Sequence, residues 1–346
     1  MLLGGLYMTT IRHQETSAGR VLNSSLKEDP DAPFRKIFGE KWDEYRRKWA
    51  AASRMEYRPD FPLFVRFETK FRCNLHCKMC VHGHPDLEKG YSYDGEMDFK
   101  TYCRLIDECA EHNCPSIGMN HANEPLLDKD LIERINYATK RGIMDIHMNT
   151  NAMLLTEEMS EKLLNTGLTR LCFSVDALSP ETFKKIRVDA DYNKVMSNID
   201  TFLNLKIKLN VELPATRVSL VLQEDNKQEV EAFREYWVKK VDYVAIQRYV
   251  PISPFDQEEN DSRAHATSFS PKEGKQKCSY AWESLFIHGD GLALPCAAHR
   301  ARKIAVGNIH KNYLYEIWNS PSMEELRQKH KQGNLEGLRL CPTCIQ

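Results

Sequence analysis

The sequence lacks an excess of charge of either sign, an apolar run long enough to cross a membrane, and any internal repeat or low-complexity tract. Its 48 basic and 49 acidic side chains nearly cancel, so charge gives no reason to expect a nucleic acid or an anionic membrane as a partner. The N-terminal MLLGGLYM has no basic residue before its apolar run, which is too short for an export signal. We therefore expect a cytoplasmic protein with neither a membrane nor a nucleic-acid partner.

Eleven cysteines occur in this chain without an export signal, which favours metal or redox chemistry over a disulfide framework. Three of them form CxxxCxxC within RCNLHCKMCV: Cys73, Cys77 and Cys80. Three thiolates this close can hold three irons of a [4Fe-4S] cluster and leave the fourth iron open to a small ligand. A structural zinc site usually has four protein ligands, so the spacing disfavours zinc although His76 and His82 lie nearby. The simpler alternative is three unrelated buried cysteines.

Strands and helices alternate from residue 63 onward, where LFVRFE reads as a strand that leads into the cysteine loop. Helices are expected at 98–113, 129–141, 157–166, 180–187, 193–205 and 227–239, and strands at 116–120, 144–149, 170–175, 209–222 and 241–247. Strands separated by helices of this length pair in parallel. The expected fold class is therefore α/β, with functional groups at the carboxyl ends of the strands.

The flanking segments have different patterns. Residues up to about 31 are polar and without periodicity, so we expect a loose tail. Apolar and aromatic residues then recur at helical spacing over 34–52, which predicts an amphipathic helix that packs on the body and has no chemical role. Residues 251–277 are polar and rich in turn formers, which indicates a linker or a lid.

The CxxxCxxC loop after a strand, followed by alternating helices and strands, resembles the radical S-adenosylmethionine (radical SAM) superfamily. This resemblance implies a partial (β/α)6 TIM-like barrel over 61–250, preceded by an N-terminal tail and amphipathic helix over 1–60. It also implies that the open iron binds the amino and carboxylate groups of SAM. In that family the reduced cluster cleaves SAM to methionine and a 5'-deoxyadenosyl radical, which abstracts a hydrogen atom from the substrate.

The resemblance also implies SAM contacts. Glu124, in the run His121-Ala-Asn-Glu-Pro125, matches the glutamate of a Gly-Gly-Glu-Pro motif that holds the SAM amino group, with Ala122 and Asn123 in place of the glycines. The remaining matches are Asn123 itself, Met79 near adenine, Asn149 and Thr150 on the third strand, Ser174 near the ribose, and Arg217 at the SAM carboxylate. Each of these polar residues has the alternative role of ending a strand or capping a helix.

Strand alternation gives a further expectation for the fourth strand. If Ser174 points into the barrel, Cys172 and Asp176 share its side, while Leu171, Phe173 and Val175 face the helices. Cys172 would then be a hydrogen-atom donor to a substrate radical, although a free cysteine is more commonly a packing residue.

Four more cysteines follow the polar segment: Cys278, Cys296, Cys341 and Cys344. The run SLFIHGDGLALPC predicts a hairpin at Gly289-Asp-Gly291 that brings the first two together, and a helix over 313–332 returns the chain to the last two. Four thiolates suit either a closed [4Fe-4S] cluster or tetrahedral zinc. The spacing and the terminal CPTC resemble the twitch/SPASM type of domain, which implies one auxiliary [4Fe-4S] cluster in a small hairpin-plus-helix domain over 278–346.

The resemblance with one auxiliary cluster favours a radical SAM oxidoreductase of the dehydrogenase type, acting on a small sugar- or cyclitol-like substrate. Epimerase, dehydratase, decarboxylase and peptide-modifying maturase remain alternatives, because the fold does not select the reaction. Arg248, at the end of the sixth strand, would orient or deprotonate the substrate. Because arginine normally stays a cation, it is better suited to anchor the substrate than to act as a base. His147 and Asp176 compete as bases.

An electron donor such as flavodoxin or ferredoxin is implied by the family chemistry, and a peptide remains a second substrate class. The alternative from another functional class is a non-catalytic iron-sulfur or zinc protein that serves as an electron carrier or binding module. That alternative predicts no cleavage of SAM.

Overall fold

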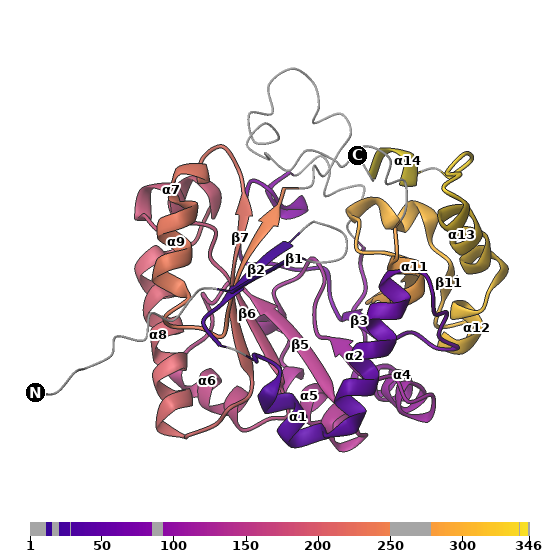
Figure 1. Ribbon diagram of the computed structural model, residues 1–346, viewed down its shortest axis with the longest axis horizontal. Coiled ribbons are helices and arrows are strands. Elements are labelled where there is room, and N and C mark those ends of the chain that lie inside the picture. Colours follow the sequence, from indigo (N-terminus) through magenta and orange to yellow (C-terminus); the bar gives the residue numbers. More distant parts are fainter. Residues whose placement is uncertain are drawn as a thin grey trace, which may run out of the picture.

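A single mixed sheet organises the protein, seen here in a computed structural model that describes residues 12–15, 21–27, 29–84, 93–249, 278–338 and 340–344 (Figure 1). The sheet contains β1 (Arg12–Glu15), β2 (Val21–Ser25), β3 (Phe64–Glu68), β4 (Ser116–Gly118), β5 (Asp145–Thr150), β6 (Arg170–Ser174), β7 (Ala215–Leu222), β8 (Tyr243–Arg248), β9 (Ser284–His288), β10 (Leu292–Leu294) and β11 (Gly307–Asn308). The expected linker over 251–277 lies outside the described residues.

The strand order is β1-β2-β8-β7-β6-β5-β4-β3-β9-β10-β11. Strands β3 to β8 are parallel neighbours in chain order, which confirms the expected α/β fold with a partial (β/α)6 barrel. The sheet continues beyond the barrel, because β9 pairs in parallel with β3 from Phe64↔Ser284 to Glu68↔His288. The small C-terminal domain therefore shares the barrel sheet and lies beside the strand that leads to the cysteine loop.

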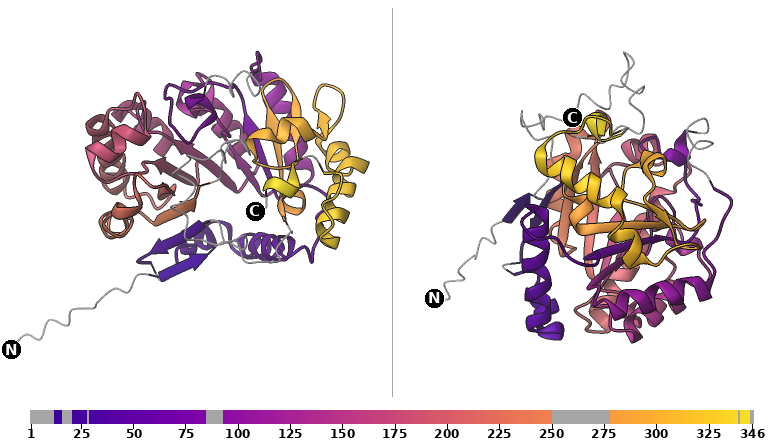
Figure 2. Two further views of the ribbon diagram at one scale, coloured as in Figure 1. Left: turned by 90° about the horizontal axis from the view of Figure 1, so that it is seen from above. Right: turned by 90° about the vertical axis from the view of Figure 1, so that its right-hand side faces the viewer.

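Helices cover the outer face of the sheet (Figures 1 and 2). They are α4 (Phe99–Glu111), α5 (Leu131–Lys140), α6 (Glu157–Leu164), α7 (Pro180–Ile186), α8 (Tyr192–Lys208) and α9 (Val230–Trp237), with short 3-10 turns η1 (Val81–Gly83), η2 (Pro125–Leu127) and η3 (Lys227–Glu229). Side-chain oxygens define several starts: Asp98, Thr156, Ser179 and Asp191 each accept a backbone N–H of the first turn.

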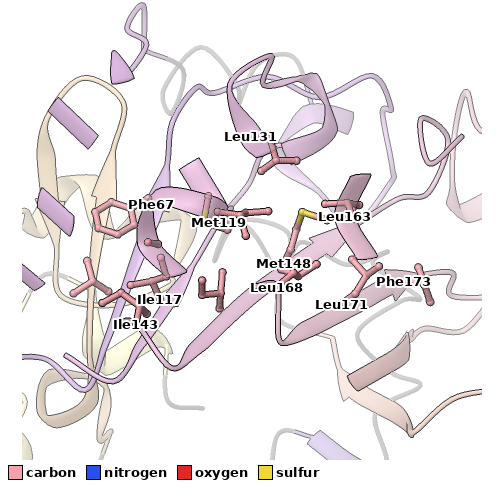
Figure 3. Close-up of a cluster of buried hydrophobic side chains, with 14 of the residues drawn as sticks. Phe67, Ile117, Met119, Leu131, Ile143, Met148, Leu163, Leu168, Leu171 and Phe173 are labelled. Atoms are coloured by element: carbon pink, nitrogen blue, oxygen red, sulfur yellow. The ribbon is translucent and has the colours of Figure 1, made fainter. Parts of the chain in front are cut away.

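The core lies between these helices and the sheet. Alternate strand residues, among them Ile117, Met148, Leu171 and Phe173, are buried together with helix residues such as Leu131 and Leu163 (Figure 3). The expected alternation of β6 holds, since Leu171, Phe173 and Val175 belong to this core. The intervening residues, including Cys172 and Ser174, therefore face the interior of the barrel.

The N-terminal region differs from the expected loose tail. Residues 12–15 and 21–25 form β1 and β2, and β2 pairs antiparallel with β8 at the sheet edge. Their residues, RHQE and VLNSS, do not alternate between apolar and polar side chains, so no periodicity predicts these strands. The expected helix over 34–52 is two helices, α1 (Ala32–Phe38) and α2 (Glu40–Ser53), because Gly39 between them has a positive φ of 58°.

These two helices close the amino-terminal end of the barrel. Phe34 and Trp42 are fully buried and stack at 4.3 Å, against Ala215 at the start of β7. The Arg170 guanidinium lies 4.2 Å from the Phe34 ring centre and pairs with Asp145. Because this end is sealed by packed side chains, the carboxyl ends of the strands remain as the place for a site.

The C-terminal domain contains α11 (Tyr280–Glu283), the three strands β9 to β11, η5 (His299–Ile304), α12 (Leu314–Trp318), α13 (Pro321–Gln332) and α14 (Cys341–Cys344). The predicted hairpin is confirmed: Gly291, at φ 88°, donates its N–H to His288 O. The expected helix over 313–332 is divided, because Ser320 caps a new helix that begins with Pro321.

Two further findings complete the fold. Strand β7 begins at Ala215 and not at 209, because α8 extends to Lys208 and Asn210 turns the chain with a φ of 52°. Within the described ranges, none of the helices has both the length and the apolar character needed to cross a bilayer.

Candidate active site

The CxxxCxxC loop follows β3 and is held by the end of α7. His76 and Lys78 donate their backbone N–H groups to Val188 O and Ile186 O, at 3.2 and 3.1 Å. Gly83 is required beside the loop, since a Cβ there would lie 2.3 Å from Cys77 O. These contacts fix the backbone from which all three thiols project.

The thiols of Cys73, Cys77 and Cys80 are buried or partly buried, as the ligands of a metal cluster usually are. Cys77 is buried and Cys73 and Cys80 are partly buried. Burial raises the pKa of Cys73 to about 11 and that of Cys80 to about 12, so these thiols ionise at neutral pH only when a metal replaces the proton. Arg187 Nη1 donates to Cys77 Sγ at 3.5 Å and favours a thiolate there. The three residues therefore fit the three-thiolate set of a [4Fe-4S] cluster.

Arg187 belongs to a buried ion pair that sequence reasoning missed. Its guanidinium pairs with Asp176, which is fully buried just after β6, and Asp176 Oδ1 also accepts from Val221 N at 2.7 Å. Asp176 was expected as a competing base inside the barrel. The structure instead places it as the partner of the arginine that touches Cys77. No pattern in the sequence links residues 77, 176 and 187.

Glu124 lies beside the cysteine loop, because its backbone N–H binds Arg72 O at 2.9 Å. Glu124 is 3% exposed, and its carboxylate accepts hydrogen bonds from Thr150 Oγ1 and Asn151 N, both at 2.8 Å. Burial raises the pKa of Glu124 to about 7. Thr150, an expected SAM contact, thus orients Glu124, which remains a candidate partner for the SAM ammonium.

The other expected SAM contacts lie at the same end of the sheet. Asn123 Oδ1 accepts from His121 N at 3.0 Å, and Asn149 N donates to Asn120 Oδ1 at 3.0 Å. Met79 is partly buried within the cysteine loop, and Ser174 is partly buried at the end of β6. Their contacts with SAM stay predictions.

Cys172 and Arg217 meet across neighbouring strands. They are register partners on β6 and β7, and Arg217 Nε donates to Cys172 Sγ at 3.3 Å. Cys172 is 5% exposed. Its thiol thus lies in the barrel interior beside a cation, as the strand alternation predicted, while its role as a hydrogen-atom donor stays a prediction.

A second arginine of the barrel interior, Arg66 on β3, was not predicted as a site residue. Its Nε is buried with no hydrogen-bond partner among the described residues, and its guanidinium lies 5.1 Å from the Phe64 ring centre. Burial lowers the pKa of Arg66 to about 10. A guanidinium with a buried donor that lacks a partner favours an anionic group. The signal was present in LFVRFE, where a charge interrupts an apolar strand.

The remaining candidate bases differ in their surroundings. His147 Nε2 lies 2.8 Å from Asp145 Oδ2 inside the barrel, and burial lowers the pKa of His147. Arg248 ends β8 and is partly buried. His147 therefore lies beside a carboxylate, and Arg248 keeps the role of a candidate anchor.

The expected auxiliary cysteines flank the elements of the C-terminal domain. Cys278 lies before α11, Cys296 follows β10, and Cys341 begins α14; all three are partly buried. Cys278 donates its backbone N–H to His330 Nδ1 at 3.2 Å. The side chain of Cys344 lies outside the described part of the structure. By its chemistry, a set of four thiols, three of them on described elements of this domain, fits a fully ligated cluster.

A polar network joins this domain to the loop after β4. His121 Nε2 lies 3.0 Å from Ala297 O, next to Cys296, and His121 Nδ1 lies 3.2 Å from His288 Nε2 on β9. Glu68, at the end of β3, accepts from Ala122 N at 2.5 Å and from Tyr93 Oη at 2.8 Å. Burial raises the pKa of Glu68 to about 7. The two sites are thus connected through a few buried side chains.

Two family models match the chain. The model of the Radical SAM superfamily matches residues 68–236, and that of the SPASM iron-sulfur cluster-binding domain matches residues 278–345. Among curated proteins, the GTP 3',8-cyclase of Clostridium botulinum (strain Hall) is 29% identical over 196 residues. That match covers 56% of this chain and 57% of the cyclase, so it spans little more than half of the relative.

Solved structures show the same fold. Streptococcus suis SuiB bound to its precursor peptide SuiA has a TM-score of 0.61 and 14% identity, covering 92% of this chain and 89% of that chain. BtrN in complex with AdoMet and 2-DOIA has a TM-score of 0.50 and 17% identity, covering 78% and 87%. These likenesses show the fold alone. The two family models, which together match more than half of the chain, show that it belongs to the radical SAM superfamily and is a radical SAM enzyme with a SPASM iron-sulfur domain, whose cofactors are SAM and two [4Fe-4S] clusters.

Proposed function

We propose that this enzyme is an oxidoreductase that converts an alcohol of a small sugar- or cyclitol-like substrate to a carbonyl. The substrate carbon bearing the hydroxyl loses a hydrogen atom to the 5'-deoxyadenosyl radical, one electron goes to the auxiliary cluster, and the hydroxyl proton goes to a base. These three losses together remove two hydrogens, and they leave a C=O bond.

The observation that carries this proposal is the position of the auxiliary domain. Ala297, next to Cys296, is hydrogen-bonded to His121, three residues before Glu124. An auxiliary cluster held there lies against the mouth of the barrel, where a substrate radical would form. Four cysteines would saturate that cluster, so accepting an electron is the work left to it.

The chain's own residues have proposed roles around this reaction. We assign the SAM-site cluster to Cys73, Cys77 and Cys80, and the auxiliary cluster to Cys278, Cys296, Cys341 and Cys344. Glu124, with its carboxylate held by Thr150 and Asn151, would bind the SAM ammonium. Met79, Asn123, Asn149, Ser174 and Arg217 complete the proposed SAM contacts.

Two arginines would bind anionic groups in the barrel. Among the described residues, the buried Nε of Arg66 has no hydrogen-bond partner, and Arg217 Nε donates to the thiol of Cys172. A SAM carboxylate satisfies one of them, and a carboxylate or phosphate of the substrate would satisfy the other. Arg248 would anchor the substrate at the end of β8. An electron donor such as flavodoxin or ferredoxin would approach the exposed residues of the cysteine loop, His76 and Lys78.

A second candidate function is cyclisation of a purine nucleotide. The curated relatives with 27–30% identity are GTP 3',8-cyclases or probable ones, and Arg66, whose buried Nε has no partner in the described part of the chain, suits a phosphate. Modification of a peptide is a third, since SuiB shares the fold with its precursor peptide bound. These candidates differ in substrate and not in the initial cleavage of SAM.

The test is turnover by the anaerobically reconstituted enzyme with a panel of aminocyclitols, sugars, GTP and peptides. Under the proposal, an alcohol deuterated at the reacting carbon gives a carbonyl product and one deuterium in 5'-deoxyadenosine. Formation of a cyclised nucleotide, or a modified peptide without any reaction of the alcohols, would contradict it. A product epimer that takes up solvent deuterium would instead assign Cys172 as a hydrogen-atom donor.

A further inference from the structure

Three potential metal ligands converge at the mouth of the barrel, outside both cysteine sets. Glu68 ends β3, His121 follows β4, and His288 ends β9. Their ligand atoms lie within 4.8 Å of one another. His121 Nδ1 is 3.2 Å from His288 Nε2, and each of these nitrogens is 3.8 Å from an oxygen of Glu68.

This triangle has the dimensions of a bound metal ion's ligand set. Ligands about 2.0–2.1 Å from a tetrahedral ion are separated from one another by about 3.3 Å. The two 3.8 Å distances involve different oxygens of Glu68, since Oε2 faces His121 and Oε1 faces His288; the carboxylate would therefore bind the ion through both oxygens or turn to present one of them. Two imidazoles with one carboxylate suit zinc or non-haem ferrous iron.

The surroundings of the triangle support it. The side chains of Glu68, His121 and His288 are 0%, 8% and 6% exposed, so a carboxylate is buried here with two imidazoles and two neutral donors, Tyr93 Oη and Ala122 N. A divalent ion would supply the positive charge that a buried carboxylate needs. His121 offers Nδ1 to the site while its Nε2 faces Ala297 O, as metal-bound histidines commonly do.

We infer that Glu68, His121 and His288 bind a divalent transition-metal ion, zinc or ferrous iron, separate from the two iron-sulfur clusters. The ion would join the ends of three parallel strands, β3, β4 and β9. It would thereby connect the loop that carries Glu124 to the domain that carries the auxiliary cysteines.

Arg302 sets a condition for this site. Its Nη1 lies 3.0 Å from His288 Nδ1, whereas an ion on Nε2 requires the proton of His288 to be on Nδ1. Arg302 also contacts Asp290, at 3.3 Å through Nη1 and 2.5 Å through Nη2. Binding of the ion therefore exchanges one contact of Arg302 and leaves its ion pair with Asp290 in place.

The experiment measures metals in the full chain. Anaerobically reconstituted enzyme is equilibrated with Zn²⁺ or Fe²⁺, desalted and analysed for metals. We expect one metal per chain beyond the roughly eight irons of two clusters. Zinc X-ray absorption should show only N and O neighbours at about 2.0–2.1 Å, without sulfur at about 2.3 Å. In the iron arm, Mössbauer spectra should show one high-spin ferrous site besides the clusters.

Variants locate the ion. Glu68→Gln and His288→Ala should lose the extra metal and keep eight irons. His147→Asn removes another histidine that lies beside a carboxylate, and this variant should keep the extra metal. Zinc should raise the melting temperature of the parent chain and of His147→Asn only. No metal beyond eight irons, sulfur neighbours around zinc, or full retention in Glu68→Gln would overturn the assignment. If the chain binds no extra metal, His121 and His288 form a hydrogen bond with each other in place of a metal site, and the assignment is wrong.

Discussion

The contact between Arg187 and Cys77 should influence the reduction potential of the SAM-site cluster. Because Arg187 is also paired with Asp176, the potential can be shifted in either direction by replacing one partner or the other. Arg187 Nη1 is 3.5 Å from Cys77 Sγ, while Asp176 pairs with the same guanidinium. A positive charge stabilises the more negative, reduced cluster, and a negative charge destabilises it. Removing the two partners one at a time should therefore shift the potential in opposite directions.

The size of each shift follows from Coulomb's law. A unit charge about 6 Å from the added electron, at an effective dielectric constant of about 20, contributes about 2.8 kcal/mol. For a one-electron couple this equals about 120 mV. We expect Arg187→Gln to lower the potential by up to about that amount and Asp176→Asn to raise it by a similar amount. The double variant should lie near the parent enzyme.

Stability follows a different pattern in the same variants. Arg187→Gln leaves Asp176 buried without its cation, at a cost of about 3–5 kcal/mol. Arg187→Lys keeps the charge and should shift the potential least. Asn is a suitable replacement at 176, where φ is 65°, because it tolerates this left-handed conformation. If the potentials of Arg187→Gln and Asp176→Asn shift in opposite directions while their stabilities fall by different amounts, the shifts arise from charge and not from a loss of folding.

The assay is an anaerobic redox titration followed by EPR, with the auxiliary cluster as an internal control whose potential should stay constant. Iron content confirms that each variant holds both clusters. The electrostatic reasoning is refuted if Arg187→Gln and Asp176→Asn shift the SAM-site potential in the same direction. It is also refuted if the auxiliary cluster shifts as much as the SAM-site cluster.

Three further outcomes are expected. Because burial raises the pKa of Glu124 to about 7, its carboxylate ionises as the pH rises through 7. The affinity for SAM, measured by calorimetry, should therefore increase with pH by up to about tenfold per pH unit below 7. In Glu124→Gln the affinity should depend much less on pH. Cys341→Ala should keep about four irons and the formation of 5'-deoxyadenosine but stop substrate oxidation, and loss of both would indicate a folding role. Gly83→Ala should lose iron from the SAM site alone, since its Cβ would meet Cys77 O at 2.3 Å; unchanged iron content would contradict this.

Much of the barrel could be predicted, because local patterns determine it. Alternating apolar strands and amphipathic helices predict β3 to β8 and the helices between them, and the CxxxCxxC spacing places the cysteine loop. Strand alternation also predicts that Cys172 faces the interior, where Arg217 meets it. These features depend on neighbours in the sequence or on adjacent strands.

The missed features depend on contacts between distant segments. Arg187 and Cys77 are 110 residues apart, and β9 joins β3 across more than 200 residues. Strands β1 and β2 extend the sheet beyond β8, and their residues, RHQE and VLNSS, show no alternation of apolar and polar side chains that would predict strands. Arg66 and Glu68 did leave a signal, since they follow each other at a period of two on β3, which places both on the inner face.

The two ends of the barrel differ in how their buried charges are compensated. At the amino-terminal end, the partly buried Arg170 and the fully buried Asp145 are paired with each other beside the aromatic ring of Phe34 on α1. At the carboxyl end, Glu68 and Glu124 are buried carboxylates held mainly by neutral donors, and both have a raised pKa. Since burying an ionised group without a counterion is costly, such an arrangement is retained where a ligand supplies the opposite charge. This arrangement supports binding of a cation at each carboxylate, which we propose to be the SAM ammonium at Glu124 and the inferred metal ion at Glu68.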